Sequence, residues 1–210
     1  ACRWPKQKLI TNQNIQEGDV IVGLASFGKA NYEDHYNSGI GSNGLTSARH
    51  DTLNKFYAQH YKESYNTGLQ DEVVYIGNHK LTDTLETGNE LENIGRLLLS
   101  PTRTYAPVIK KILENHFDKV HGLIHCSGGG QTKCMKYLPA DFKIIKDNLF
   151  KPPLVFEIIR QNSGATLQEM YEVFNMGCRL EIFCKPGDAQ IMIDVAEEFA
   201  VQAQITGRVE

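Results

Sequence analysis

The feature that most constrains the fold is the run from Val120 to Gln131, in which a short apolar stretch ends in a histidine and three consecutive glycines. The apolar part predicts a buried strand that opens into a loop at His125. Glycine has no Cβ, so Gly128–Gly130 can adopt positive φ and let a ligand approach their N–H groups. If residues 131–138 are helical, their free N–H groups and the helix dipole face the same point. An anion-binding loop and a flexible turn both fit this pattern.

A similar arrangement is predicted nearer the start of the chain. The β-branched run Val20–Ala25 is typical of a strand covered on both faces. It leads through a polar, aromatic loop to the glycine-rich stretch 38–44. From Leu45 to Tyr61, apolar residues recur at helical spacing, which predicts a helix of about four turns. A strand, a glycine-rich loop and a helix are therefore expected twice.

The rest of the chain alternates between helical and extended patterns. Further helices are predicted at 105–117, after Pro153, behind the capping-box pattern Thr166–Glu169 and at 188–200, and further strands at 142–145, 179–184 and 204–209. Residues 62–99 are predicted to form short strands joined by turns, with one strand at 73–76. This pattern suggests a hairpin-like insertion, which is either a surface elaboration or a substrate lid or oligomer contact. Strands and helices without a strict βαβ rhythm predict one α+β domain, with helices covering a mixed β-sheet.

Composition and net charge limit the classes of binding partner that are expected. The net charge of −3, from 25 acidic and 22 basic residues, offers no basic field for nucleic acid or an anionic membrane, so a small molecule is expected. No apolar run approaches the roughly 18 residues of a membrane span, and no signal peptide is visible, which favours a cytoplasmic protein. Five cysteines without C-x-x-C spacing predict core residues, with no disulfide framework and no metal site.

Five blocks stand in one order along the chain. They are Glu17–Ser26, Ser42–Arg49, Pro101–Tyr105, His125–Gly130 and Phe174–Cys178. Together they resemble the C-terminal domain of aminoimidazole ribonucleotide synthetase, also called phosphoribosylformylglycinamidine cyclo-ligase. The resemblance implies α/β/α layers and covers the chain except 30–37 and about 62–95, which are expected to be insertions.

The resemblance implies an enzyme of purine biosynthesis. Members convert formylglycinamidine ribonucleotide, with ATP and Mg²⁺, to aminoimidazole ribonucleotide; the formyl oxygen is activated by phosphoryl transfer before the ring closes. Such chemistry depends on positioning and charge neutralisation. The same resemblance implies a homodimer formed chiefly through an N-terminal domain that also binds most of the ATP and metal. The chain begins without methionine, so residues 1–19 are expected to be the tail of that domain, and 20–210 a single domain inactive alone and without its own cofactor.

Site residues follow from the matched blocks. His125 is the expected catalytic residue, as general acid or base or as a donor to an oxyanion, although a hydrogen-bonded histidine at a strand end also fits. The Ser127 and Gly128–Gly130 amides are expected to bind phosphate. The facing Ser42, Asn43 and Gly44 could do the same, or could form a turn and a helix cap. Which loop holds the ribose phosphate is left open.

Two arginines are further candidates for the site, and the chain differs from the family pattern at one position. Arg103 and Arg49 are candidate anion partners, and a structural or surface ion pair fits each of them equally well. The family commonly has a histidine before Ser-Asn-Gly, where this chain has Gly41. We hypothesise that His35, on the adjacent insertion, replaces it. Cys126 is not expected to be a nucleophile, because this chemistry needs none.

Other readings remain open. Selenophosphate synthetase, thiamine monophosphate kinase and the synthetase domain of formylglycinamidine ribonucleotide amidotransferase share the two-domain plan and also use ATP. A non-catalytic phosphate-binding or oligomerisation module is the alternative from another class.

Overall fold

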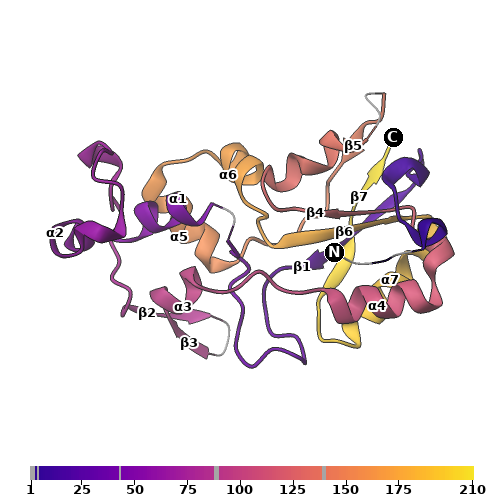
Figure 1. Cartoon of the computed structure of the whole chain (residues 1–210), viewed down its shortest axis with the longest axis horizontal. Helices are drawn as coiled ribbons and strands as arrows, with labels where there is room; N and C mark the ends of the chain where they lie inside the picture. The colour runs from indigo at the N-terminus through magenta and orange to yellow at the C-terminus, as the bar shows by residue number, and fades with distance from the viewer. Residues whose placement is uncertain (1–2, 4, 43, 88–89, 139–140) are drawn as a thin grey trace.

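The computed structural model describes residues 3, 5–42, 44–87, 90–138 and 141–210. The molecule is elongated, with a five-stranded sheet at one end and a group of short helices at the other (Figure 1). No helix in this part of the chain is long and apolar enough to span a bilayer. Helices and antiparallel strands together confirm the predicted α+β class.

The order of strands in the sheet decides where its loops emerge. From edge to edge the strands are β4 (Gly122–His125), β6 (Cys178–Cys184), β1 (Val20–Ala25), β7 (Ala203–Val209) and β5 (Ile144–Ile145). Each pairs antiparallel with its neighbours. Since β1 and β4 are both antiparallel to β6, they run in the same direction. The loops that follow them, both glycine-rich, therefore leave the same end of the sheet.

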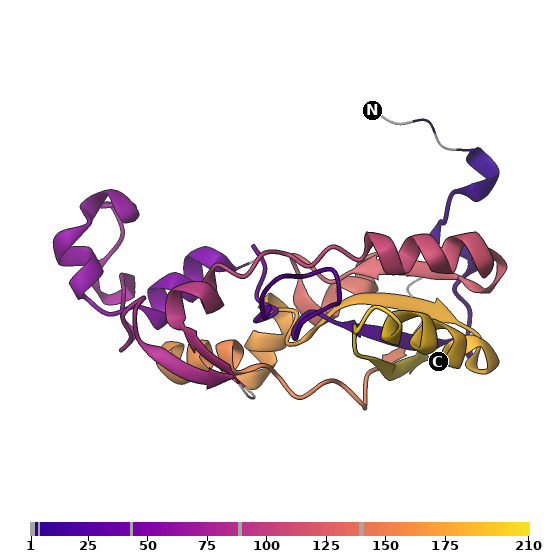
Figure 2. The same ribbon diagram turned by 90° about the horizontal axis from the view of Figure 1, so that it is seen from below.

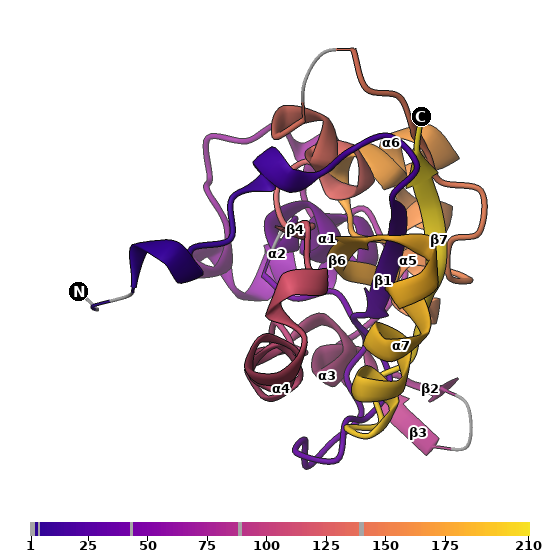
Figure 3. The ribbon, with the colours of Figure 1, turned by 90° about the vertical axis from the view of Figure 1, so that its right-hand side faces the viewer.

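Both faces of the sheet are covered (Figure 3). On one face, α4 (Ala106–Asn115) and α7 (Ala189–Glu197) pack through Val108 and Met192 on Leu24 and Ile182. The other face carries Ile21, Ile124 and Phe183, covered by Ile15 and by Cys134 of the 3₁₀ helix η6 (Gly130–Lys136). Every residue of β6, which lies between β4 and β1, is buried, because a strand covered on both sides has no solvent face.

The helical end, seen from below in Figure 2, is held together by a second hydrophobic core of its own. Its elements are α1 (Leu45–Thr52), α2 (Phe56–His60), α3 (Ile94–Leu98), α5 (Leu154–Ser163), α6 (Leu167–Val173) and the hairpin of β2 (Thr84–Thr87) and β3 (Glu90–Asn93). Phe156, Ile159 and Met170 are buried there. Val74 and Tyr75, from the expected insertion 62–95, are buried in the same core, so this segment supports the fold. Short 3₁₀ turns occur at Lys6–Lys8, Asn12–Asn14, Lys62–Ser64, Asp71–Val73, Phe117–Lys119 and Pro186–Asp188.

Most predicted elements are confirmed, including the Thr166–Glu169 capping box. The single helix expected at 45–61 is wrong: it breaks at Leu53, which turns extended and bridges His79. A strand at 73–76 is also wrong. Tyr75 has a φ of 49° and its ring packs on His50, so Val74 and Tyr75 are buried through their side chains, while Val73 and Ile76 are exposed.

Candidate functional site

Phe174 brings the two glycine-rich loops together. A Cβ on Gly44 would lie 2.5 Å from the Phe174 ring, and a Cβ on Gly130 would lie 2.6 Å from the Phe174 carbonyl oxygen. Only glycine fits at either position while Phe174 stays in place. The loops expected to face each other therefore meet around one residue of the Phe174–Cys178 block.

Asn175 and Gln131 fix this meeting point by hydrogen bonds. Asn175 Nδ2 donates to the Gly39 carbonyl at 2.9 Å, and Asn175 Oδ1 accepts from Ser26 Oγ at 2.7 Å. From the other loop, Gln131 Nε2 donates to the carbonyls of Asn175 at 2.6 Å and Cys178 at 2.8 Å. These four hydrogen bonds are buried. A buried network whose hydrogen bonds are all made fixes the loops in one arrangement.

The three glycines have different roles. Gly130 is buried, and its amide donates to the Ser127 carbonyl at 3.0 Å. Gly128 is exposed, Gly129 has a φ of 97°, and neither amide donates to another described residue. The two open amides are the part of the triplet that can bind an anion, because a free N–H is an unused donor.

Lysine side chains supply the positive charge beside these amides. The helix expected after the triplet is the 3₁₀ helix η6, a poor source of a helix dipole. Lys133, on η6, donates from Nζ to Ser127 Oγ at 2.7 Å, and Lys136 Nζ would lie 3.7 Å from a Cβ on Gly129. Lys133 was not among the predicted residues; its position one turn after the triplet was the available signal.

His125 lies at the end of β4, half-buried, where the glycine loop begins. Its ring meets Tyr105 edge-on, with 6.4 Å between centroids, and it lines a hollow of about 210 Å³ with Lys133 and Tyr137. Burial, and then the positive charges of Arg179 and Lys133, lower the pKa of His125. The imidazole is therefore neutral near pH 7 and can accept a proton.

The chain matches a protein-family model described as "AIR synthase related protein, C-terminal domain" over residues 16–210. The chain belongs to this family.

Several relatives carry the name phosphoribosylformylglycinamidine cyclo-ligase, and two are described here. The Methanopyrus kandleri protein is 31% identical over 96% of the chain and 46% of its own length. The Brevibacillus brevis protein is 28% identical over 98% of the chain and 49% of its own length. The chain thus spans about half the length of these relatives. The solved structure of "T. maritima PurL complexed with AMPPCP" aligns over 97% of the chain and 23% of its own, with a TM-score of 0.45 and 11% identity.

Of the five blocks on which the resemblance rests, Pro101–Tyr105 stabilises the fold. Arg103 is 3% exposed and forms a two-pronged ion pair with Glu33, at 2.9 and 2.7 Å. Its other donors reach the carbonyls of Ala25, Phe27 and Gly28 at 2.8–3.0 Å. The structural alternative is therefore favoured for Arg103, because its guanidinium hydrogens are already used. Glu33 belongs to the expected insertion 30–37, which thus holds the loop after β1.

The remaining predicted residues lie in different settings. Arg49 donates to the Ser64 carbonyl at 3.1 Å and lines an apolar hollow of about 350 Å³ in the helical end. His35 is exposed, and no hydrogen bond joins its side chain to another described residue. Asn43 lies outside the described residues. Cys126 is buried, and burial raises the pKa of its thiol, which opposes a nucleophilic role.

Ser42 is held by the Pro101–Tyr105 block. Its amide donates to Thr102 Oγ1 at 3.4 Å, while the side chain is exposed. The preceding Gly41 has a φ of 60°, and a Cβ there would lie 2.5 Å from Nη2 of Arg179. The space beside residue 41 is therefore filled by an arginine from β6. Nothing in the sequence pattern indicated this contact.

A separate buried network anchors η6 beneath the site. Lys146 forms an ion pair with Glu181 of β6 and donates to the Gln131 carbonyl at 2.7 Å. Burial and the Glu181 charge act in opposite directions on Lys146, and the net effect raises its pKa. Both side chains are largely covered, so their role is to fix η6, and with it Lys133, against the sheet.

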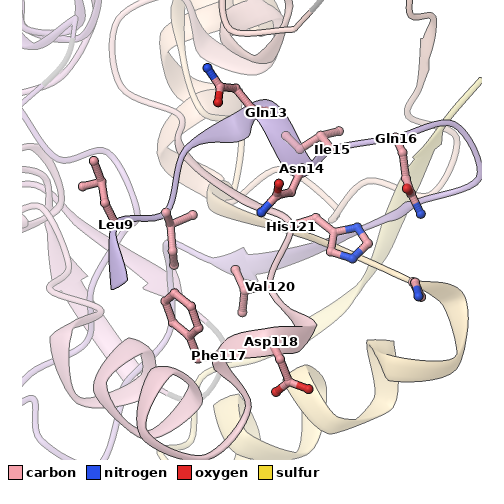
Figure 4. A pocket seen from close by; sticks show the side chains of 11 residues that line it. Leu9, Gln13, Asn14, Ile15, Gln16, Phe117, Asp118, Val120 and His121 are labelled. Atoms are coloured by element: carbon pink, nitrogen blue, oxygen red, sulfur yellow. The ribbon is translucent and has the colours of Figure 1, made fainter. Parts of the chain in front are cut away.

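A second hollow lies at the other end of β4 (Figure 4). It measures about 450 Å³ and is lined by residues that include Gln13, Gln16, Asp118 and His121. His121 Nδ1 lies 2.8 Å from Asp19 Oδ2, an interaction that ties the segment before β1 to β4. This hollow is separate from the His125 site. No group of three or more potential metal ligands occurs among the described residues.

Proposed function

We propose that this chain is the C-terminal, substrate-side half of an ATP-dependent cyclo-ligase that converts formylglycinamidine ribonucleotide to aminoimidazole ribonucleotide. The single observation that carries the proposal is the convergence on Phe174 of two glycine-rich loops, one of which begins at the neutral His125. Family membership over residues 16–210 and the names of the relatives support the choice of reaction. As an enzyme of purine biosynthesis, it would act in the cytoplasm.

The residues of this chain hold and orient the substrate. The amides of Gly128 and Gly129, with Lys133, bind a phosphate group, since unused N–H donors and an ammonium together suit an anion. Ser42, Asn43 and Gly44 contact the same substrate from the facing loop. Neutral His125 accepts a proton from the substrate nitrogen that closes the ring, or donates a hydrogen bond to the oxygen that leaves.

ATP and Mg²⁺ belong mainly to the half of the relatives that lies beyond this chain. When bound, ATP supplies the phosphoryl group that activates the formyl oxygen. The chain contributes the wall opposite the nucleotide, and partners with an N-terminal domain in a homodimer. His35 remains a candidate for a second imidazole at this wall.

Turnover by the protein encoded in full tests the proposal. With ATP, Mg²⁺ and formylglycinamidine ribonucleotide, we expect release of ADP, phosphate and aminoimidazole ribonucleotide. His125→Ala and Asn43→Ala should each lower kcat/KM by about 10²-fold or more, the scale of one acid–base or oxyanion contact. His35→Ala should lower it only if His35 reaches the substrate. No turnover in the wild type would refute the function, whereas unchanged turnover in both site variants would refute the site.

A further inference from the structure

Arg179 is a buried cation without an ion pair among the described residues. It is 1% exposed, and its Nη2 donates to the carbonyls of Ile40 at 2.6 Å and Gly39 at 3.2 Å. The other cations buried near the sheet each have a carboxylate: Arg103 has Glu33, and Lys146 has Glu181. A buried charge ordinarily needs a counter-charge. The exception at Arg179 therefore calls for an anion from outside the described part of the chain.

A β-bulge sets the direction of this side chain. Leu24 of β1 pairs with Leu180 and Ala25 pairs with Cys178, so Arg179 is the extra residue of β6. A bulge bends the strand and re-aims the side chain at that position. The guanidinium consequently reaches the end of the sheet from which both glycine-rich loops emerge.

Gly41 is shaped to accept the guanidinium. A Cβ at residue 41 would lie 2.5 Å from Arg179 Nη2, 2.8 Å from its Cζ and 2.8 Å from Thr102 Oγ1. The positive φ of 60° and the lack of space both exclude other residues while Arg179 keeps its place. Arg179 thus defines the path of the loop 39–42, whose Ser42 amide contacts Thr102.

The groups around His125 leave this charge unneutralised. His125 faces Arg179 from β6, Lys133 from η6, the Tyr105 ring at the start of α4, and Tyr137 across the small hollow. Two of these four are cations and none is a carboxylate. Lys133 and Lys136 also flank Gly129, whose amide is open, in the loop that begins after His125.

We propose that Arg179 is a positioning residue of this site, which fixes the loop 39–42 and supplies, beside His125, a buried positive charge that a phosphate group neutralises. The inference rests on the proposed function in taking the ligand to be a phosphate ester. It adds that the positive charge of Arg179 has no counter-charge until that ester binds. The phosphate can belong to the ribonucleotide or to the nucleotide, and the two sources are distinguished below.

The test compares the wild type with Arg179→Gln, which removes the charge, and Arg179→Lys, which keeps it. The imidazole of His125 is titrated by NMR, with and without ribose 5-phosphate, inorganic phosphate or a non-hydrolysable ATP analogue as separate probes. In Arg179→Gln we expect a higher pKa of His125 and at least tenfold weaker binding of one phosphate probe. Arg179→Lys should retain a pKa near that of the wild type. If Arg179→Gln weakens ribose 5-phosphate most, Arg179 binds the phosphate of the ribonucleotide substrate. If it weakens the ATP analogue most, Arg179 binds a phosphate of the nucleotide.

A merely structural role would leave these two readouts unchanged. A wild-type pKa and wild-type phosphate affinity in a folded Arg179→Gln variant would overturn the inference. If that variant does not fold, the wild type decides alone: the pKa of His125 should rise when a phosphate probe binds, and an unchanged value with all three probes would overturn it. None of these measurements uses turnover, so a failed cyclo-ligase assay would refute the proposed function without touching this result.

Discussion

Gly44 lies so close to Phe174 that a Cβ on the glycine would stand 2.5 Å from Cε1 of the ring. The contact joins the start of α1 to the block that ends α6, far apart in sequence. A Cβ on Gly130 would likewise lie 2.3 Å from the Tyr171 carbonyl oxygen and 2.6 Å from that of Phe174. The two loops can therefore lie this close together only because residues 44 and 130 are glycines.

Gly44→Ala should destabilise the protein more than a matched glycine substitution elsewhere. Gly164, which ends α5, has nearly the same backbone angles, with φ of 70° against 72°, but a Cβ there would meet nothing within 4 Å. Gly164→Ala should cost about 1–2 kcal/mol of unfolding free energy from backbone strain alone. Gly44→Ala should add roughly 1–3 kcal/mol from overpacking. Equal losses in urea unfolding would show that Phe174 yields easily.

Arg103 should matter for stability and not for phosphate binding. Arg103→Met leaves the Glu33 carboxylate without its partner, which should lower the unfolding free energy by about 3–5 kcal/mol. Arg208→Met is the control, because that arginine pairs with Asp147 and Glu210 at the exposed surface, where little change is expected. Phosphate affinity that collapses in a still-folded Arg103→Met variant would restore Arg103 as an anion partner.

The Lys146–Glu181 pair should show strong coupling. Lys146→Met leaves the fully buried Glu181 carboxylate unpaired, which should cost about 3–5 kcal/mol. Adding Glu181→Leu removes that charge and should recover most of the loss, because an apolar pair of similar size is tolerated. A double variant as unstable as the sum of the two single variants would indicate independent roles. Calorimetry of the four proteins measures this cycle.

His125 should make stability depend on pH in a defined direction. Burial lowers its pKa in the folded protein, so the unfolded chain binds more protons below the ordinary value of about 6.5. The unfolding free energy should therefore fall as pH drops through about 6.5 toward the lowered folded value. His125→Asn should remove this part of the slope. Parallel stability curves for the two proteins between pH 7 and 5 would contradict the assignment.

The sequence predicted the elements well because their signals are local. The capping box at Thr166, the stripe of α4 and the buried run of β1 each depend on spacing within one segment. The helix at 45–61 failed for a non-local reason: Leu53 is diverted by contact with His79. Tertiary contacts override helical spacing at such points.

For the site, the sequence indicated the two loops and His125 but not the charges around them. Lys133 follows the triplet on a 3₁₀ helix, and its ammonium reaches Ser127 only because η6 turns back. Arg179 reaches Gly41 through a bulge that depends on the pairing of two distant strands. The contact also explains the glycine at position 41, where the resemblance led us to expect a histidine. Spacing along one segment shows only that Lys133 is near the triplet, and it carries no signal for the contact between Arg179 and Gly41.

An NMR titration of the amide groups tests the central claim, that the two loops form one phosphate site. The probe is ribose 5-phosphate, and the variant Lys133→Met tests whether the ammonium group of Lys133 contributes to binding. We predict that the amides of Gly128, Gly129, Ser42 and Gly44 shift with a single Kd, that Gly164 does not shift, and that Lys133→Met weakens the affinity at least tenfold. Glycine amides that stay in place, or two loops that titrate with different Kd values, would contradict the account.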